Sequence, residues 1–294
     1  MAEEVSLQAT QIALREDGSA IMNAQPQTNA DVTAPAEPLC WICKKNKADS
    51  GEHKTKRSDL LAVLGKVSQK QPFFYSDTKR KNHVVGSLDA RILKSPVRIC
   101  AHCNNARTQP HDRAWERMSD RLRSRRLTIG RWVRCDRIFG YLTKREMLAV
   151  HMYFLKLFGC MIAEAKANGH EVPIDLDVFS NAIMSGRPHP GVHLQFGRYD
   201  LGIGRSDLHC WKTDPGGSVL GGWLYQLEPI AVSVLYVQAG KFEDRRDLWH
   251  PHSRTSAKRF LVADFMYSKR DKADLPEQSE SGPGGEACEG GQGL

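Results

Sequence analysis

The chain has 294 residues, of which 40% are hydrophobic and 26% charged, and its formal net charge is +8. This length supports one or two domains, and the composition is ordinary for a soluble globular protein. The absence of any run of about 18 apolar residues argues against a transmembrane helix. The acidic, polar N-terminus has the wrong composition for a secretory signal, so we expect a cytoplasmic protein without membrane contact. Eight cysteines in that compartment favour metal ligands over a disulfide framework.

The positive charge is concentrated in one part of the chain. Residues 37–140 contain 24 Lys and Arg against 10 Asp and Glu, a net charge of +14, whereas the rest of the chain carries a net charge of −6. A strongly basic segment in an otherwise mildly acidic chain predicts a polyanionic partner. A solvated basic surface without a partner is the alternative.

Composition divides the chain into four parts. Residues 1–36 and 271–294 are polar or rich in Gly, Glu and Ser, which predicts disordered tails. Residues 37–137 hold both CxxC pairs and predict a small zinc-stapled domain that binds nucleic acid. Residues 138–270 predict a second domain, whose role the sequence does not indicate.

Hydrophobic patterns predict the secondary structure of these two domains. Short helices are expected near residues 56–65 and 110–126, and a long helix over 142–169. Runs rich in β-branched and aromatic residues follow the long helix, separated by Gly, Pro and Asp, and predict a mostly antiparallel sheet. The predicted fold class is therefore α+β.

Four cysteines occur in two pairs, Cys40-Trp-Ile-Cys43 and Cys100-Ala-His-Cys103. Each CxxC turn directs two sulfurs to one point, and four thiolates at about 2.3 Å satisfy a tetrahedral Zn²⁺ ion. Because the pairs are far apart in the sequence, the ion would join two remote segments. We predict a structural zinc ion, with free buried thiols or a redox pair as alternatives.

An acidic residue and a histidine, Glu52 and His53, stand between the CxxC pairs, and Asn104 follows the second pair. The order CxxC, acidic-His, CxxC-Asn resembles HNH endonucleases with a zinc knuckle, whose active site is a ββα-metal motif. The resemblance covers about residues 38–115. It implies that Glu52 and Asn104 bind a catalytic Mg²⁺ or Mn²⁺, that His53 is the general base, and that Arg107 contacts a phosphate. The implied function is hydrolysis of phosphodiester bonds in DNA, with RNA as an alternative, and compact basic nucleases of this kind resemble those of phage and mobile elements.

The residue types suit this chemistry. Phosphodiester cleavage needs a base with a pKa near neutrality, and a hard cation with oxygen ligands. Lys54 and three arginines of the predicted helix at 110–126, namely Arg113, Arg117 and Arg121, would extend the contact along the nucleic-acid backbone.

The sequence departs from the family pattern at Ser95, where the family has an asparagine that orients the loop of the histidine. Asn82-His83 is the alternative source of that side chain. Two other functions therefore stay open. One is a non-catalytic zinc module that binds nucleic acid, and the other is an interaction protein whose C-terminal sheet binds a protein partner.

Two further groups of polar residues predict structural roles. Asp112 follows Pro110 at the start of a helix, where an acidic side chain suits the positive end of the helix dipole. The histidines of the C-terminal part, including His189 and the His250-Pro-His252 run, lack a cysteine or acidic partner at ligand spacing. We expect these histidines on the surface.

Overall fold

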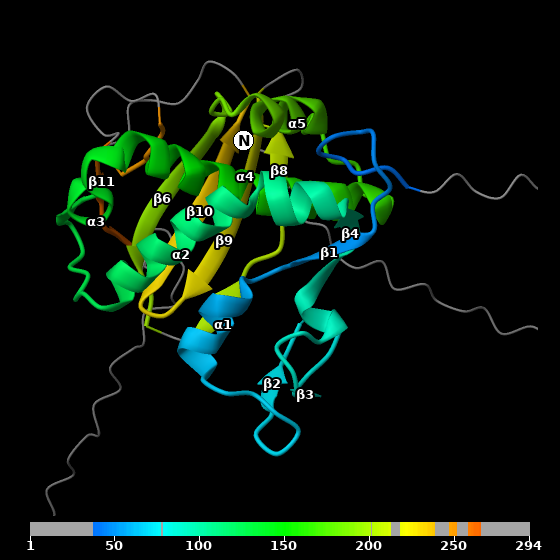
Figure 1. The fold of residues 1–294 in the computed structure, drawn as a ribbon, viewed down its shortest axis with the longest axis horizontal. Helices are drawn as coiled ribbons and strands as arrows, with labels where there is room; N and C mark the ends of the chain where they lie inside the picture. Colours follow the sequence, from blue (N-terminus) through cyan, green and yellow to red (C-terminus); the bar gives the residue numbers. More distant parts are fainter. Residues whose placement is uncertain are drawn as a thin grey trace, which may run out of the picture.

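The structure is a computed structural model that describes residues 38–77, 79–200, 202–212, 218–238, 247–251 and 258–265. The predicted tails at 1–36 and 271–294 lie outside the described residues. Helices and mostly antiparallel strands both build the described part (Figure 1), which confirms the α+β class.

The part of the chain with the CxxC pairs contains two antiparallel strands followed by a helix. β1 (Ser50–His53) pairs with β4 (Lys94–Ile99), and the chain then passes through a π-helical turn (Cys103–Arg107) into α2 (Gln109–Arg123). Pro110 lies in the first turn of α2, where its fixed φ suits a helix and its missing N–H leaves no bond unmade. The predicted helix at 110–126 is confirmed.

The chain between β1 and β4 forms a small unit of its own. α1 (Arg57–Leu64) is followed by the pair β2 (Phe73–Tyr75) and β3 (His83–Val85), and then by a 3-10 turn, η1 (Arg91–Leu93). This unit has a separate small hydrophobic cluster, made of Leu60, Val85, Leu88 and Leu93. The helix predicted at 56–65 is confirmed.

Three helices follow α2. They are α3 (Asp136–Phe139), α4 (Thr143–Ala167) and α5 (Leu176–Ser185), with a 3-10 turn, η3 (Gly140–Leu142), between α3 and α4. α4 matches the predicted long helix. The stretch Asp136–Ala167 is long and apolar enough to span a membrane, but 83% of its apolar window is buried inside the fold. That burial is the property of a core helix and is consistent with a soluble protein, while the compartment stays a prediction.

A six-stranded sheet contains most of the strands after α5. Its order is β12-β6-β10-β9-β7, and β8 also pairs with β9. Among the described strands of this sheet, the β12–β6 pair is the only parallel one. The bounds are β6 (Val192–Arg198), β7 (Ile203–Arg205), β8 (His209–Lys212), β9 (Val219–Leu227), β10 (Ile230–Val237) and β12 (Ala263–Asp264). A separate ribbon joins β5 (Trp132–Arg134) to β11 (Arg259–Leu261).

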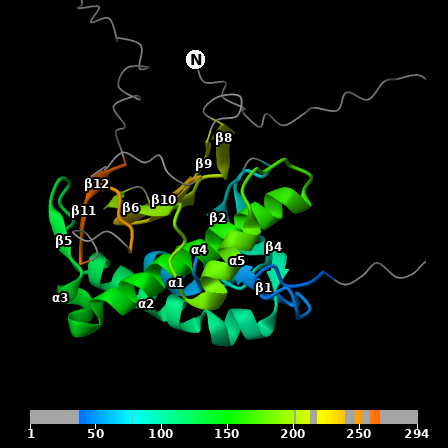
Figure 2. The same ribbon diagram turned by 90° about the horizontal axis from the view of Figure 1, so that it is seen from above.

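α2 and α4 cover one face of the large sheet (Figure 2). Trp115 of α2 lies among the rings of Tyr153 and Phe154 on α4 and Tyr225 on β9, at centroid distances of 5.7, 4.7 and 5.9 Å. The main hydrophobic core includes residues from both sides of the predicted boundary at residue 137, among them zinc-cluster cysteines. The two predicted parts therefore share one core, with α4 at its centre.

Candidate functional site

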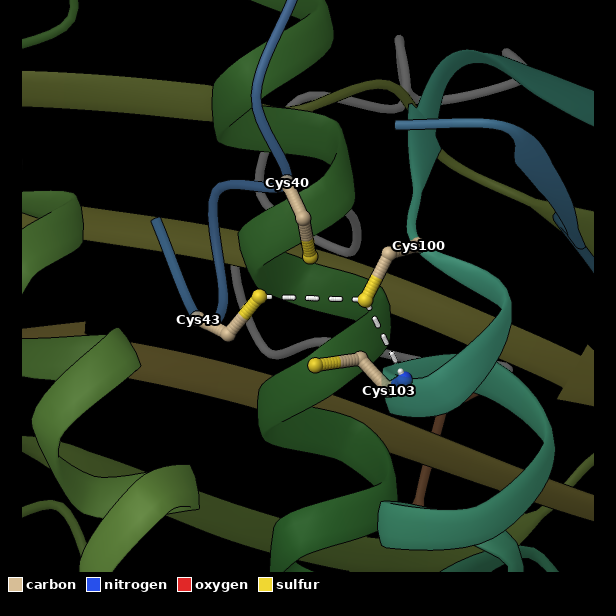
Figure 3. A group of neighbouring side chains, drawn as sticks. All are labelled: Cys40, Cys43, Cys100 and Cys103. Atoms are coloured by element: carbon tan, nitrogen blue, oxygen red, sulfur yellow. Dashed lines mark hydrogen bonds between the residues drawn. The ribbon is translucent and has the colours of Figure 1, made fainter. Parts of the chain in front are cut away.

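The four cysteines of the CxxC pairs converge in space (Figure 3). Their sulfurs all lie within 4.8 Å of one another, and Cys43 Sγ is 3.7 Å from Cys100 Sγ. Four sulfurs around a tetrahedral Zn²⁺ at about 2.3 Å are about 3.8 Å apart. Cys40 and Cys103 are fully buried. The cluster is consistent with a zinc site closed by four protein ligands.

The four cysteines, here called the zinc cluster, accept hydrogen bonds from nearby residues, and the first CxxC pair also packs against the core. The Cys103 amide donates a hydrogen bond to Cys100 Sγ at 3.3 Å, and Asn46 Nδ2 donates to the same sulfur at 3.6 Å. The ring of Trp41, inside the first pair, lies against Gly159 of α4, where an added Cβ would come within 2.3 Å of it. An ion in this cluster would thus fix β1 and the start of the helix after β4 against α4.

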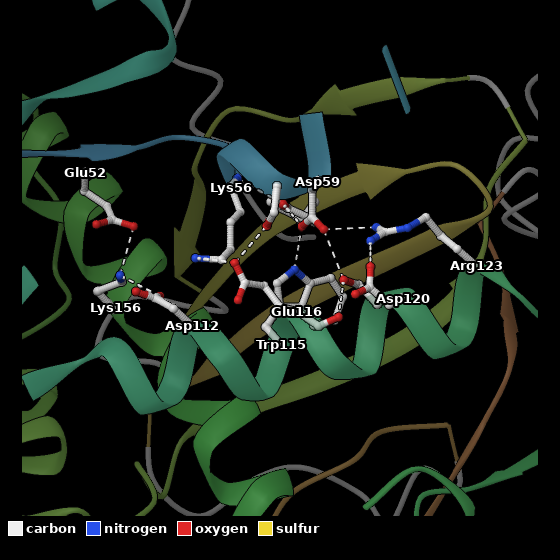
Figure 4. Close-up of polar contacts among 12 residues, drawn as sticks. Glu52, Lys56, Asp59, Asp112, Trp115, Glu116, Asp120, Arg123 and Lys156 are labelled. Atoms are coloured by element: carbon white, nitrogen blue, oxygen red, sulfur yellow. Dashed lines mark hydrogen bonds and ion pairs between the residues drawn. The ribbon is translucent and has the colours of Figure 1, made fainter. Parts of the chain in front are cut away.

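Glu52 lies where the register of the β1–β4 pair shifts, between Gly51 and His53. Such an irregularity redirects a side chain. The carboxylate of Glu52 lies 2.9 Å from Nζ of Lys156, a fully buried residue of α4, and the same ammonium lies 2.8 Å from Asp112 (Figure 4). Burial alone would lower the pKa of Lys156, but the two carboxylates outweigh it and raise the pKa, so the ammonium stays charged.

Asp112 is in the first turn of α2, but its carboxylate binds Lys156 and caps no backbone N–H of the helix. Its place in the first turn is the one that the helix-dipole argument predicts, and the ion pair with Lys156 is an additional tertiary contact. Burial raises the pKa of Glu52, against the opposite effect of Lys156. Burial and the nearby Lys156 lower the pKa of His111 to about 4, so this neighbour stays neutral. The cluster of Glu52, Asp112 and Lys156 thus combines two carboxyl groups with one ammonium group.

His53 is oriented by the small unit between β1 and β4. Its Nε2 lies 3.2 Å from the backbone oxygen of Leu88 and 3.7 Å from Asp89 Oδ1. Because a carbonyl only accepts hydrogen bonds, Nε2 carries the proton and the lone pair is on Nδ1. Burial lowers the pKa of His53, and the hydrogen bond to Leu88 opposes this in part. A neutral imidazole in this tautomer is a base at Nδ1.

Asn104 connects the helical turn after β4 with β1. Its Nδ2 donates to Ser50 Oγ at 2.9 Å and to the Gly51 carbonyl oxygen at 3.4 Å. With the nitrogen so engaged, Oδ1 is the remaining acceptor of this side chain. Asn104 thus holds β1 immediately before Glu52.

Glu52 and His53 both line a small pocket of about 10 Å³, which is room for about one water molecule. Lys54 also lines it and pairs with Glu164 of α4 at 3.6 Å, and Ser95 Oγ donates to the same carboxylate at 3.4 Å. Burial lowers the pKa of Lys54, and the nearby Arg205 lowers it further. Lys54 is therefore directed toward α4. Asn82 and His83 are exposed in the hairpin of β2 and β3.

The arginines predicted to bind nucleic acid face outward from α2. Arg113, Arg117 and Arg121 are all exposed. Arg117 pairs with Glu146 of α4 and remains 52% exposed, whereas Arg113 and Arg121 have no ion pair within the described part of the chain. Arg107 is half-buried, and its Nε has no hydrogen-bond partner among the described residues.

Sequence reasoning missed Lys156 as a site residue. The available signal was a single lysine in the apolar run HMYFLKLFG, because a charge that a helix carries into a core needs a partner there. The expectation that His189 lies on the surface is wrong: it is 3% exposed, packed against Phe179.

Comparisons with known proteins do not assign this chain to a family. No protein-family model matches the chain, and neither a curated protein nor a solved structure matches it. A function has to be inferred from the residues of this chain.

Proposed function

We propose that the protein is a zinc-stapled, HNH-like nuclease that hydrolyses phosphodiester bonds in DNA, with His53 as the general base. One observation carries the proposal. The strand with Glu52 and His53 pairs antiparallel with a second strand, and the chain then passes through the second CxxC pair into the helical turn with Asn104 and Arg107. Two strands and a helix in this order are what the resemblance to HNH endonucleases implies.

The state of His53 supports its role as the base. Nδ1 would take a proton from the attacking water, while Nε2 continues to donate to the Leu88 carbonyl. Asp89, near Nε2, would offset the charge of the imidazolium that forms. Because burial lowers the pKa of His53, the neutral form that a base requires is present at neutral pH.

The oxygen donors of the site suit a hard cation. Glu52 and Asn104 would hold a Mg²⁺ or Mn²⁺ ion, which supplies positive charge to the phosphate and the leaving oxygen when bound. Lys156 engages Oε1 of Glu52, and Oε2 has no partner among the described residues. A second cation can therefore share this carboxylate with Lys156.

The outward arginines of α2 support a nucleic-acid substrate. Arg113, Arg117 and Arg121 are four residues apart, which is about 6 Å along a helix, and their side chains are exposed. Contacts of this kind bind phosphates and position the strand without reading bases, so RNA stays an alternative substrate.

A non-catalytic module that binds nucleic acid is the second candidate. The observation that favours it is the ammonium of Lys156, which already neutralises part of the charge that would attract a divalent ion to Glu52. Ser95 in place of the family's asparagine favours it as well, since Ser95 bonds Glu164 of α4.

Cleavage of supercoiled plasmid tests the nuclease. The zinc-loaded protein is incubated with Mg²⁺ or Mn²⁺, beside His53→Ala and the control His209→Ala, which removes an exposed histidine of β8. We expect nicking by the wild type and the control, no nicking without the divalent ion, and a loss of at least about 100-fold in His53→Ala. Equal cleavage by His53→Ala would refute the base. A protein that retards DNA without cutting it would support the binding module.

The pH dependence of cleavage tests the base independently. A base must be neutral, and the pKa of His53 is lowered, so the acidic fall in rate should lie below the ordinary histidine value of about 6.5. We therefore expect more than half of the plateau rate to remain at pH 6.5. An acidic midpoint above 6.5 would contradict this assignment.

A further inference from the structure

The C-terminal end of α2 lies near α3 and the β5–β11 ribbon (Figure 2), and residues of this region line a broad hollow of about 390 Å³. Its volume is within the range of small-ligand sites, about 300–1,000 Å³. Apolar side chains form part of its wall, and the polar lining consists of arginines with one tryptophan. These residues, here called the Arg/Trp pocket, are Arg125, Arg126, Trp132, Arg134, Arg137 and Arg259.

The charge of the Arg/Trp pocket is poorly compensated. All five arginines are exposed, and only Arg134 has an ion pair, with Asp136, among the residues that the structure describes. Arg134 and Arg259 are direct cross-strand partners in the β5–β11 ribbon. Like charges directly opposite each other destabilise an antiparallel pair, so a bound anion would relieve this contact.

An aromatic ring lies among the arginines of this pocket. Trp132 is 41% exposed, and the guanidinium of Arg259 lies over its ring, 4.6 Å from the centroid. Phe260, next to Arg259, is buried in the core and anchors the ribbon. An exposed indole beside guanidinium planes is a surface on which a nucleobase can stack.

We infer that the Arg/Trp pocket binds single-stranded nucleic acid, with phosphates on its arginines and one unpaired base on Trp132. A duplex offers its phosphates to arginine but keeps its bases paired, and so leaves Trp132 without a partner. The inference rests on the nucleic-acid binding of the proposed function and does not require cleavage.

The pocket also continues the basic face of α2. Arg113, Arg117 and Arg121 lead in steps of four residues to Arg125, just beyond the helix end. α2 is about 22 Å long at 1.5 Å per residue. A strand held near His53 would follow this face into the pocket.

Fluorescence anisotropy with a labelled oligothymidylate tests the inference, in buffer without Mg²⁺ or Mn²⁺ so that no cleavage occurs. Trp132→Ala should weaken binding of the single strand about tenfold and leave binding of a duplex of equal length unchanged. Arg125→Ala should weaken binding of both and reduce the salt slope for the single strand by about 0.7. The control Arg187→Ala, at an exposed arginine after α5, should change neither.

Unchanged single-strand binding in Trp132→Ala and Arg125→Ala would overturn the inference. Equal losses for single strand and duplex in Trp132→Ala would also overturn it, because the ring would then have no role in stacking. If Trp132→Ala does not fold, Arg125→Ala and Trp132→Phe test the inference instead. Arg125 lies outside the β5–β11 ribbon, and Trp132→Phe keeps an aromatic face. Pocket-dependent binding without plasmid cleavage would refute only the nuclease, and cleavage with normal binding by the pocket variants would refute only the pocket.

Discussion

Two clusters of buried charged residues contact α2, one around Asp59 of α1 and one around Lys156 of α4 (Figure 4). They differ in how completely their carboxylates are hydrogen-bonded. Asp59 of α1 is fully buried and accepts four hydrogen bonds from α2 and β9. The donors are Trp115 Nε1 at 2.6 Å, Tyr225 Oη at 2.7 Å, Arg123 Nη1 at 3.0 Å and Ser119 Oγ at 3.1 Å. Both oxygens of Asp59 are thus occupied, and the cluster is saturated.

Lys156 instead divides one ammonium between two carboxylates, those of Glu52 and Asp112. The cluster has one more carboxyl group than ammonium groups, and Glu52 borders the small pocket that His53 also lines. The difference separates two uses of a buried acid. A carboxylate with every acceptor site filled by the protein holds elements together, whereas a partly bonded carboxylate at a pocket retains capacity for a ligand.

Removal of the zinc ion should affect both clusters and have the largest effect. β1, which carries Glu52, and the start of α2 are held by the four cysteines, so Cys43→Ser should release the metal and unfold this part of the chain. Apparent binding energies of structural zinc reach about 10–16 kcal/mol, more than a domain's whole stability. Metal content and far-UV circular dichroism should fall together, with Cys210→Ser of β8 as the control. Unchanged metal content would reject the site.

Asp59→Asn should have the next largest effect, because it leaves Arg123 without its buried partner and gives Trp115 and Tyr225 a poorer acceptor. Loss of one partner from a buried charge network costs about 3–5 kcal/mol. Urea unfolding at pH 7 measures this free energy, with the exposed Asp207→Asn as the matched control. A loss below about 1 kcal/mol would show that the network is not structural. Added Mg²⁺ should not restore stability.

Lys156→Met should cost less, about 1–3 kcal/mol at pH 7, because Glu52 and Asp112 retain some solvent contact and can take up protons. Burial and the neighbouring Asp112 raise the pKa of Glu52, and the variant loses the opposing effect of Lys156, so it should approach the wild type as the pH falls toward 4. Millimolar Mg²⁺ should stabilise this variant in urea unfolding and should leave Asp59→Asn unaffected. If Mg²⁺ stabilises both or neither, the two clusters do not differ in the way proposed.

Arg117→Ala should have the smallest effect on stability, below about 1 kcal/mol, because its pair with Glu146 is half exposed and screened by solvent. Its effect on DNA binding should be larger. The slope of log affinity against log salt should fall by about 0.9 for duplex DNA, without a change in sequence preference. An unchanged slope would argue against a phosphate contact.

The zinc cluster was predictable because CxxC is a local pattern whose geometry is set by a single turn. The helices α1, α2 and α4 were predictable for the same reason, from periodicity and end signals. The partner of Glu52 was not, because Lys156 lies about a hundred residues away on a helix whose pattern indicates only burial. The shift of charge and composition near residue 137 likewise gave no hint that α4 packs between both parts and joins their cores.

The orientation of His53 depends on a carbonyl of Leu88, which belongs to the small cluster of Leu60, Val85, Leu88 and Leu93. That cluster is separate from the main core, and Ile203 packs against both. The proton position on the imidazole therefore depends on the packing of this small cluster, whereas Asp59 of the same segment bonds α2. Under the proposed function, a substitution in the small cluster that leaves Asp59 in place would alter the rate of cleavage while the arginines of α2 still bind nucleic acid.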